Sequence, residues 1–364
     1  MIPRIGDLGV RVGSLPAGPR DQITDVPGVR VGHWTLHTDV QHTGVTVILP
    51  RTENVYLNKC IAAADVINGY GKTAGLVQVQ ELGVLETPIA LTGTLNVGLV
   101  QDALVQYAID TCAADGVRVR SVNPVVGECN DGTLGDNRTR PVGYAQVMEA
   151  IRTAGADFAE GDVGGGAGLI CHELKGGIGS ASRIVSYDGT DYTVGVLAQA
   201  NHGQLADLEI GGAAVGPALQ ARMAGRTPRP EEKGSCILVL ATDLPVSDRQ
   251  LRRIIRRCAV GLCRNGSYLG HGSGDICIGF TTAGGVRENE DRDVVPMRQL
   301  NENRINAAFR AAAEAAQEAV LNALVCAHTV TGVDGTVYYG LRDLWQGLES
   351  PEIAGKQPLS GGKH

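Results

Sequence analysis

The stretch GSCILVLATD at residues 234–243 joins a small polar start to a continuous run of apolar residues. A run of this length with β-branched members is typical of a strand buried on both faces of a sheet. The preceding residues, 226–233, are charged and include Pro228 and Pro230, so they favour a loop. The sequence therefore predicts that a loop delivers Ser235 to the beginning of a central strand.

The Gly234–Ser235 bond allows two interpretations at this point. In the first, Gly234 is a turn residue and Ser235 begins the strand, which is a common arrangement. In the second, the Ser235 hydroxyl cuts the bond that precedes it, and Ser235 becomes a new N-terminus that supplies both a nucleophile and a base. The local sequence does not separate these interpretations, so the rest of the chain has to.

Composition sets broad bounds on the function. The chain has 364 residues, 43% of them hydrophobic, and can bury a large core. Its net charge of −7 argues against nucleic acid as a partner. No apolar segment is long enough to span a membrane, and the first residues lack a signal-peptide core. Nine scattered cysteines predict neither a zinc site nor a disulfide framework, so we expect a cytoplasmic protein.

Strand and helix patterns alternate along the chain. Strand patterns occur at 22–35, 43–50, 88–93, 192–201, 236–242 and 276–282, and a short strand precedes the polar loop within 117–142. Helical spacing occurs at 55–68, 98–115, 143–155 and 303–328, and a capping box at Ser247 and Gln250 opens a helix that extends to about residue 263. The tail from residue 357 is expected to be disordered.

Three polar or glycine-rich segments were considered as ligand sites. The segment ECNDGTLGD at 128–136 is either a solvated turn or a place where carboxylates and an amide meet a ligand. The glycine run at 161–168 matches neither a Walker A loop nor a dinucleotide-binding loop, so we expect it to serve close packing or approach to a substrate. His33, His37 and His42 have the spacing of strand and turn, and no metal is predicted there.

Several separated motifs resemble those of a family of self-processing serine hydrolases, which includes L-aminopeptidase D-esterase/amidase and the β-peptidyl aminopeptidases. They are ECNDGTLGD, CHELKGGIGSASR, VLAQANHG, GSCILVLATDLP and GHGSGDICIGFTTA, and the likeness extends over residues 23–341. The resemblance implies one α/β hydrolase domain over residues 1–364, built as a four-layer αββα sandwich like that of N-terminal-nucleophile hydrolases. It also implies autocleavage between Gly234 and Ser235 into chains 1–234 and 235–364, which stay associated.

The same resemblance assigns roles to individual residues. Ser235 matches the nucleophile, Asn201 the oxyanion-hole amide, and Ser273 with Asp275 the pair beside the nucleophile. The freed α-amine of Ser235, with an ordinary pKa of about 7.7–8.0, can act as the base, so no histidine is required.

Three further positions bear on the substrate. Glu128 or Asp131 is expected to bind the α-ammonium of the substrate. Members of the family commonly carry an aromatic residue where this chain has Thr133.

These residues predict an aminopeptidase or amidase that hydrolyses N-terminal aminoacyl amide or ester bonds without a metal or cofactor. The expected partners are a small peptide or aminoacyl-amide substrate and further copies of the αβ unit in a homo-oligomer. Two alternatives stay open. A self-cleaving N-acyltransferase of the ornithine acetyltransferase type would transfer the acyl group to an amino acid, and a non-catalytic homologue would not cleave itself.

Overall fold

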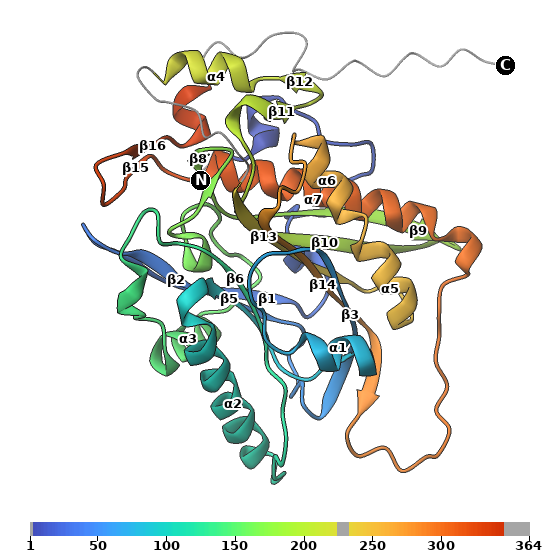
Figure 1. Ribbon diagram of the computed structural model, residues 1–364. Helices are drawn as coiled ribbons and strands as arrows, with labels where there is room; N and C mark the ends of the chain where they lie inside the picture. The colour runs from blue at the N-terminus through green and yellow to red at the C-terminus, as the bar shows by residue number, and fades with distance from the viewer. Residues whose placement is uncertain (1–2, 224–232, 346–364) are drawn as a thin grey trace, which may run out of the picture.

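The computed structural model describes residues 3–223 and 233–345. Two β-sheets pack face to face, and helices cover the outer face of each sheet (Figure 1). The apolar residues fall into three main clusters, one between the sheets and one under each helical layer. The αββα sandwich predicted from the sequence is therefore confirmed.

The first sheet has four strands in the order β1-β2-β5-β6. Its strands are β1 (Arg30–His37), β2 (His42–Leu49), β5 (Ile89–Gly93) and β6 (Val125–Cys129). The first two form an antiparallel hairpin, and β6 runs parallel to β5. Helices α2 (Val97–Ala114) and α3 (Tyr144–Arg152) pack on the outer face of this sheet.

The second sheet has six strands in the order β4-β3-β14-β13-β10-β9. Its strands are β4 (Val84–Leu85), β3 (Asn58–Gly69), β14 (Gly272–Arg287), β13 (Lys233–Thr242), β10 (Thr190–Asn201) and β9 (Gly177–Tyr187). Only the pair β13 and β14 is parallel. Helices α5 (Asp248–Ile255), α6 (Cys258–Arg264) and α7 (Asn306–Cys326) form the outer layer.

Smaller elements decorate the sandwich. They are α1 (Leu76–Leu82), α4 (Gly216–Arg222), and the two-residue strands β7 (Ile170–Cys171), β8 (Leu174–Lys175), β11 (Glu209–Ile210), β12 (Ala213–Ala214), β15 (Val330–Thr331) and β16 (Val337–Tyr338). The hairpin of β7 and β8 matters most for function, because its first residue contacts the end of β10.

Strand β13 is buried on both faces, as its apolar run predicts. Ile237 and Val239 point between the two sheets, whereas Leu238 and Leu240 point toward the helices. Each such fully buried side chain stabilises the fold by about 1.5–3 kcal/mol. The strand that begins with the Gly234–Ser235 bond is thus anchored in two cores at once.

Three expectations from the sequence are wrong. Residues 55–68 were expected to be helical, but Asn58–Gly69 form β3, because pairing with β14 and burial override the helix propensity of its alanines. The predicted helix up to residue 263 is interrupted between α5 and α6. The strand predicted at 22–35 begins only at Arg30, after a 3-10 turn at Ile23–Asp25. The tail from residue 357 and most of the loop before Ser235 lie outside the described residues.

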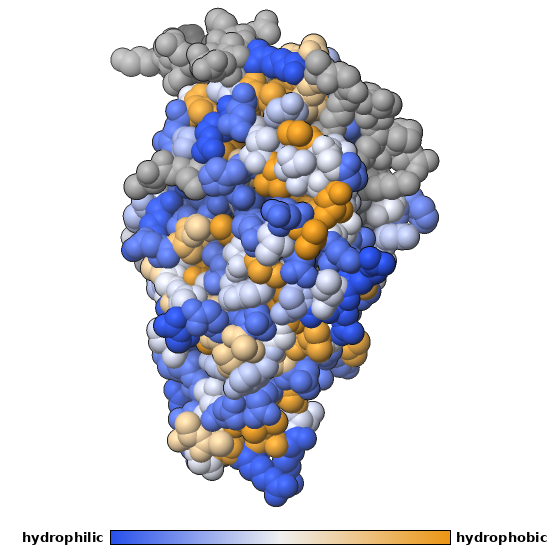
Figure 2. Space-filling model, turned by 90° about the vertical axis from the view of Figure 1, so that its left-hand side faces the viewer, coloured by the Kyte–Doolittle hydropathy of each residue, from blue (hydrophilic) through white to orange (hydrophobic). Residues whose placement is uncertain are grey.

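None of the helices in residues 3–223 and 233–345 combines the length and hydrophobicity needed to cross a bilayer. The face drawn in Figure 2 carries hydrophobic residues scattered among hydrophilic ones.

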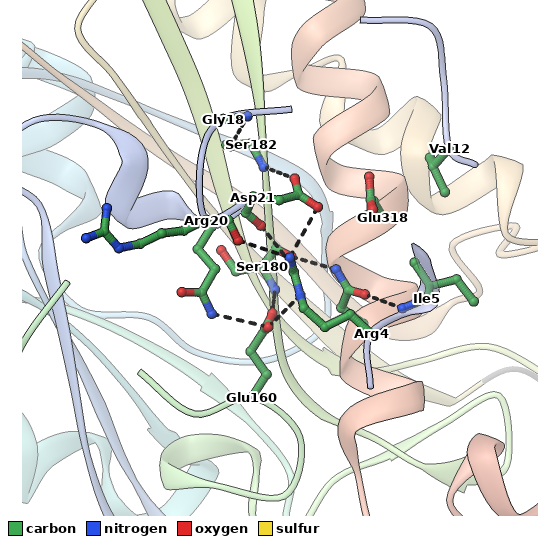
Figure 3. Close-up of polar contacts among 12 residues, drawn as sticks. Arg4, Ile5, Val12, Gly18, Arg20, Asp21, Glu160, Ser180, Ser182 and Glu318 are labelled. Carbon is green, nitrogen blue, oxygen red and sulfur yellow. Dashed lines mark hydrogen bonds and ion pairs between the residues drawn. The ribbon is translucent and has the colours of Figure 1, made fainter. Parts of the chain in front are cut away.

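The N-terminal segment is held against the second sheet by buried polar contacts (Figure 3). The Nε atom of Arg4 lies 2.9 Å from the Glu160 carboxylate, and its Nη2 donates to the carbonyl oxygen of Ser180 over 2.5 Å. The backbone N–H of Ile5 donates to Oδ1 of Asn322 in α7 over 2.9 Å. These contacts join the beginning of the chain to its last long helix.

Arg183 extends these contacts through the interior. Its guanidinium lies 3.4 Å from a carboxylate oxygen of Asp21 and 3.4 Å from one of Glu314, and it also pairs with Glu318. Only 1% of Arg183 is exposed, so its charge depends on these partners. We call this group the Arg4–Arg183 network, consisting of Arg4, Asp21, Glu160, Arg183, Glu314 and Glu318.

Candidate active site

Ser235 lies opposite the end of β10. The strand register pairs Ser235 with Asn201 on one side and with Gly274 of β14 on the other. Gly234 has φ +146°, and a Cβ there would collide with the carbonyl oxygen of Asn201. Glycine is therefore required before Ser235 both by the backbone conformation and by the close approach of the neighbouring strand.

Asn201 is the last residue of β10, as the sequence predicts for a residue at a strand end. Its Oδ1 accepts a hydrogen bond from the Ile170 N–H over 2.8 Å, and its Nδ2 donates to the carbonyl oxygen of Asn130 over 3.3 Å. Within the described residues, the side chain thus bonds to β7 and to the loop after β6, and not to its own turn at Gly203. The contact with Ile170 fixes which end of the amide is the donor, and a second Nδ2 hydrogen is left for another acceptor.

Ser273 and Asp275 form a buried pair at the start of β14. The Ser273 hydroxyl donates to Oδ1 of Asp275 over 3.0 Å, and both residues are 0% exposed. Alternation along β14 puts Asp275 on the face of Cys277, toward the helices, whereas Ser235 shares the inter-sheet face of Ile237. The pair therefore lies on the opposite face of the sheet from the Ser235 side chain. On the neighbouring strand β14, Ser273 is paired with Gly234 and Asp275 with Cys236.

A cavity of about 790 Å³ opens over Ser235. It is lined by Tyr70, Gly71, Lys72, Thr94, Glu128, Asn130, Thr133, Ile170, Asn201, Gly234, Ser235, Tyr268, Gly270, His271 and Gly272. Ser235 and Asn201 share this wall with Glu128 and Thr133, whereas Ser273, Asp275 and Asp131 are not part of it. The volume is within the usual range for a small-molecule site.

Glu128 reaches the cavity from β6, so it belongs to a strand and not to the polar loop expected from the sequence. Its Oε1 accepts the backbone N–H of Lys72 over 2.9 Å and lies 3.5 Å from Lys72 Nζ. Gly71, with φ +152°, brings its backbone so close that a Cβ would lie 2.8 Å from this oxygen. The turn before α1 is therefore wrapped tightly around the carboxylate.

Asp131, the other predicted ammonium ligand, is turned away from the cavity. Its carboxylate accepts the Thr43 hydroxyl over 2.6 Å, and only 2% of the residue is exposed. Burial raises the pKa of this carboxyl above its usual value. The geometry favours Glu128 over Asp131 as a residue that meets a ligand.

Some residues of the site were missed in the sequence. Cys129 lies behind Ser235, with its thiol 3.6 Å from the Ser235 carbonyl oxygen and 3.5 Å from that of Gln199. Burial raises the pKa of this thiol far above its usual value, so it packs the site and is not reactive. Cys129 follows Glu128 in the motif ECNDGTLGD, and this position could have identified it from the sequence. Lys72, which also lines the cavity, lies outside every motif.

One cluster could contact a metal ion. Among the described residues, Cys171, His172 and His202 bring one potential ligand atom each within 4.8 Å of one another. Burial lowers the pKa of His202 to about 3, so its imidazole stays neutral. No such group of three forms around His33, which bonds Thr46 within the described part of the chain. The chemistry proposed below uses none of these side chains.

Comparisons with known proteins identify relatives of this chain. Residues 21–338 match the sequence model of peptidase family S58. The β-peptidyl aminopeptidase BapA of Sphingosinicella xenopeptidilytica is 38% identical over 359 residues, which cover 93% of this chain and 89% of that protein. The PH0078 protein of Pyrococcus horikoshii OT3 is 44% identical, with a TM-score of 0.88 over 93% of this chain and 96% of that one.

A third comparison bears on the reaction. The L-aminopeptidase D-Ala-esterase/amidase of Ochrobactrum anthropi is 33% identical, with a TM-score of 0.86 over 94% of this chain and 98% of that one. That enzyme is described as a prototype for the serine aminopeptidases and as a new variant of the Ntn hydrolase fold. The chain therefore belongs to peptidase family S58 and is a serine aminopeptidase of the Ntn hydrolase type.

Proposed function

We propose that this chain cleaves its own Gly234–Ser235 bond and then uses Ser235 as an N-terminal nucleophile to hydrolyse N-terminal aminoacyl amides and esters. The observation that carries the proposal is the position of Ser235 on the cavity wall, opposite Asn201 and directly after a glycine whose conformation other residues rarely adopt. The two products, residues 1–234 and 235–364, stay associated because β13 is paired on both sides.

The first reaction is intramolecular. The Ser235 oxygen attacks the carbonyl carbon of Gly234, the peptide C–N bond breaks, and the nitrogen takes up a proton to become the α-amine of Ser235. Water then hydrolyses the resulting ester, which leaves the Gly234 carboxylate and restores the Ser235 hydroxyl. No metal or cofactor is needed for either step.

The second reaction repeats this chemistry on a substrate. The neutral α-amine takes the proton of the Ser235 hydroxyl, and the oxygen attacks the acyl carbon of the substrate. The Asn201 amide donates a hydrogen bond to the oxyanion, which stabilises the transition state. The leaving amine takes the proton, and water releases the acyl group from Ser235.

Ser273 and Asp275 are proposed to act on the amine and not on the hydroxyl. Support comes from their position level with the backbone of Gly234 and Cys236, on the face away from the Ser235 side chain. A buried carboxylate favours a neighbouring ammonium, so Asp275 stabilises the charge that forms during attack. Ser273 either passes the proton of the Ser235 hydroxyl to the α-amine or hydrogen-bonds to the amine that has received it.

Glu128 is proposed to bind the α-ammonium of the substrate, which makes the enzyme act at N-termini. Support comes from the placement of its carboxylate on the cavity wall shared with Ser235. Asp131 is the weaker candidate for this role because its carboxylate accepts a hydrogen bond from the Thr43 hydroxyl. The names of the BapA relatives suggest that β-aminoacyl substrates be tested beside α-aminoacyl ones.

A reducing, cytoplasmic environment is also part of the proposal. It is supported by the nine cysteines, which form no disulfide within the described residues and are nearly all buried. We further propose that the αβ units assemble into a homo-oligomer.

Intact-mass spectrometry of the purified protein tests the first reaction. We expect two polypeptides, with Ser235 at the N-terminus of the smaller, and a single uncut chain for Ser235→Ala. Ser186→Ala, at an exposed serine of β9, is the matched control and should be cut normally. Cys236 as the new N-terminus would contradict the assignment. A panel of aminoacyl anilides, with and without an added amino acid acceptor, then separates hydrolysis from acyl transfer.

A further inference from the structure

The cavity wall carries a cation as well as an anion. Lys72 Nζ lies 3.5 Å from Glu128 Oε1, and 54% of the lysine side chain is exposed whereas only 6% of the glutamate side chain is. The ammonium also donates to the Thr94 hydroxyl, which holds it in place. A fixed pair of opposite charges therefore faces the space above Ser235.

Neutralising the charge of Glu128 does not explain why a lysine side chain is placed here. The carboxylate already accepts the Lys72 backbone N–H over 2.9 Å, a bond that does not depend on the side chain. At 3.5 Å the Nζ atom is beyond the usual distance of a charge-assisted hydrogen bond, which is about 2.7–2.9 Å. An ammonium has three N–H donors, and Thr94 accepts one of them. Lys72 thus retains donors for a ligand in the cavity.

A ligand with both charges would complete this arrangement. If Glu128 binds an ammonium, a carboxylate about 3 Å from that ammonium on the same small molecule lies within reach of Lys72 Nζ. The four charges then alternate around a square, with opposite charges along each edge and like charges only across the diagonals. An ammonium without an adjacent carboxylate would instead lie next to the lysine cation and be repelled by it.

We propose that Lys72 selects substrates whose N-terminal acyl group carries a carboxylate beside its free amino group, which is the chemistry of an aspartyl residue. The inference rests on the proposed function, because Glu128 must bind the amino group. In a β-aspartyl amide both charges are on one carbon, and the scissile carbonyl is one methylene away. Thr133, where the family resemblance has an aromatic residue, also lines the cavity, and its smaller side chain leaves more room for this branched acyl group than an aromatic ring would.

Two matched pairs of p-nitroanilides test the proposal on the processed enzyme. L-β-aspartyl anilide is compared with 3-aminobutanoyl anilide, and L-α-aspartyl anilide with 2-aminobutanoyl anilide, since each pair differs only by carboxylate against methyl. We expect kcat/KM to favour the aspartyl member of at least one pair by about tenfold or more, as hydrogen bonds to charged groups typically do. The pair that shows the preference identifies the linkage.

Three variants connect the preference to the lysine. Lys72→Met should reverse or abolish it, mainly through KM, and Lys72→Arg should retain most of it because the charge is kept. Arg152→Met removes an exposed cation of α3 and should leave the preference as in the wild type. Autocleavage and the thermal midpoint of each variant confirm that it has folded.

Two results would overturn the inference. One is a wild-type preference for the methyl member of both pairs, and the other is a carboxylate preference that is unchanged in Lys72→Met. In either case hydrolysis itself still occurs, so the proposed function stands. Absence of autocleavage, or of hydrolysis of every anilide in the panel, would instead contradict the proposed function.

Discussion

The cavity around Ser235 and the Arg4–Arg183 network are both polar and largely buried, but only the cavity offers its charges to a ligand. In the network, Arg183 meets carboxylates on two sides and is closed off by protein. In the cavity, Lys72 and Glu128 lie beside each other without a full hydrogen bond between their side chains, and the lysine is half exposed. The same residue types therefore serve structure in one region and recognition in the other.

The comparison also concerns the two proposed chains. Arg183 precedes the Gly234–Ser235 bond, whereas Glu314 and Glu318 follow it, so the network would bridge both chains after cleavage. The cavity likewise combines Asn201 and Glu128 from before the bond with Ser235 from after it. Substitutions in the two regions should nevertheless have different effects. Those in and beside the cavity should change the rate of hydrolysis, and those in the network should change the free energy of unfolding.

The largest effect is expected at the pair beside the nucleophile. On fully processed enzyme, Asp275→Asn and Ser273→Ala should each lower kcat by roughly 10²- to 10⁴-fold, because the α-amine loses the groups that tune it as a base. Hydrolysis of an aminoacyl anilide and the extent of autocleavage are measured separately on the same preparation. Near-normal turnover in both variants would reduce the pair to structural residues of β14.

A loss of stability without a loss of rate is expected in the network. Arg183→Met leaves Glu314 and Glu318 buried without their cation, and breaking a buried ion pair in this way typically costs about 3–5 kcal/mol. Urea unfolding measures this change, and kcat per folded molecule should stay near the wild-type value. Arg152→Met, which removes an exposed pair with Glu149, is the control and should change stability by less than about 1 kcal/mol.

Asn201 is expected to affect the rate by an intermediate amount. Asn201→Ala should lower kcat by roughly 10²- to 10³-fold, about 2.7–4 kcal/mol of transition-state stabilisation, with little change in KM. The variant also frees the Ile170 N–H, so the thermal midpoint is measured on the same sample. A lowered midpoint with unchanged kcat would exclude the oxyanion role and leave Asn201 as a structural link between β7 and the loop after β6.

How much the sequence predicts differs between the two regions. Ser235, Asn201 and Glu128 all lie in motifs. Ser235 and Asn201 meet because they are paired at the same edge of one sheet, whereas Glu128 reaches the cavity from β6 of the other sheet. Lys72 has no motif around it, and its approach to Glu128 depends on the turn at Gly71. That turn follows β3, the element expected as a helix, so the error in local structure concealed this contact.

The Arg4–Arg183 network was not predictable in this way. Its members extend from Arg4 to Glu318, and no local pattern distinguishes a buried arginine from a solvated one. Only the packing of the N-terminal segment, β9 and α7 brings them together. Figure 3 shows Arg4, Asp21, Glu160 and Glu318 in this packing. A sequence motif can identify residues that act together within one segment, whereas ion pairs between distant segments can be identified only from the folded structure.

The smallest expected effect is a pH dependence of stability that comes from Asp21. Burial, together with the nearby Glu318, raises the pKa of Asp21 from 3.8 to about 7, against the opposing influence of Arg4 and Arg183. The native state therefore binds more protons than the unfolded state between these two pH values. Ionisation of Asp21 then lowers the free energy of unfolding as the pH rises through this window.

Asp21→Asn removes this titration, because an amide is neutral throughout. The free energy of unfolding of the variant should thus rise relative to wild type as the pH increases from about 4 to about 7, and the difference should then level off. Glu160, Glu314 and Glu318 face the same cluster in both proteins, so the difference between the two proteins isolates residue 21. Asp157→Asn, at an exposed carboxylate outside the network, is the control variant for the same measurement. A variant that instead loses stability relative to wild type over this range would contradict the prediction. It would show that Asp21 is ionised throughout and stabilised by Arg4 and Arg183.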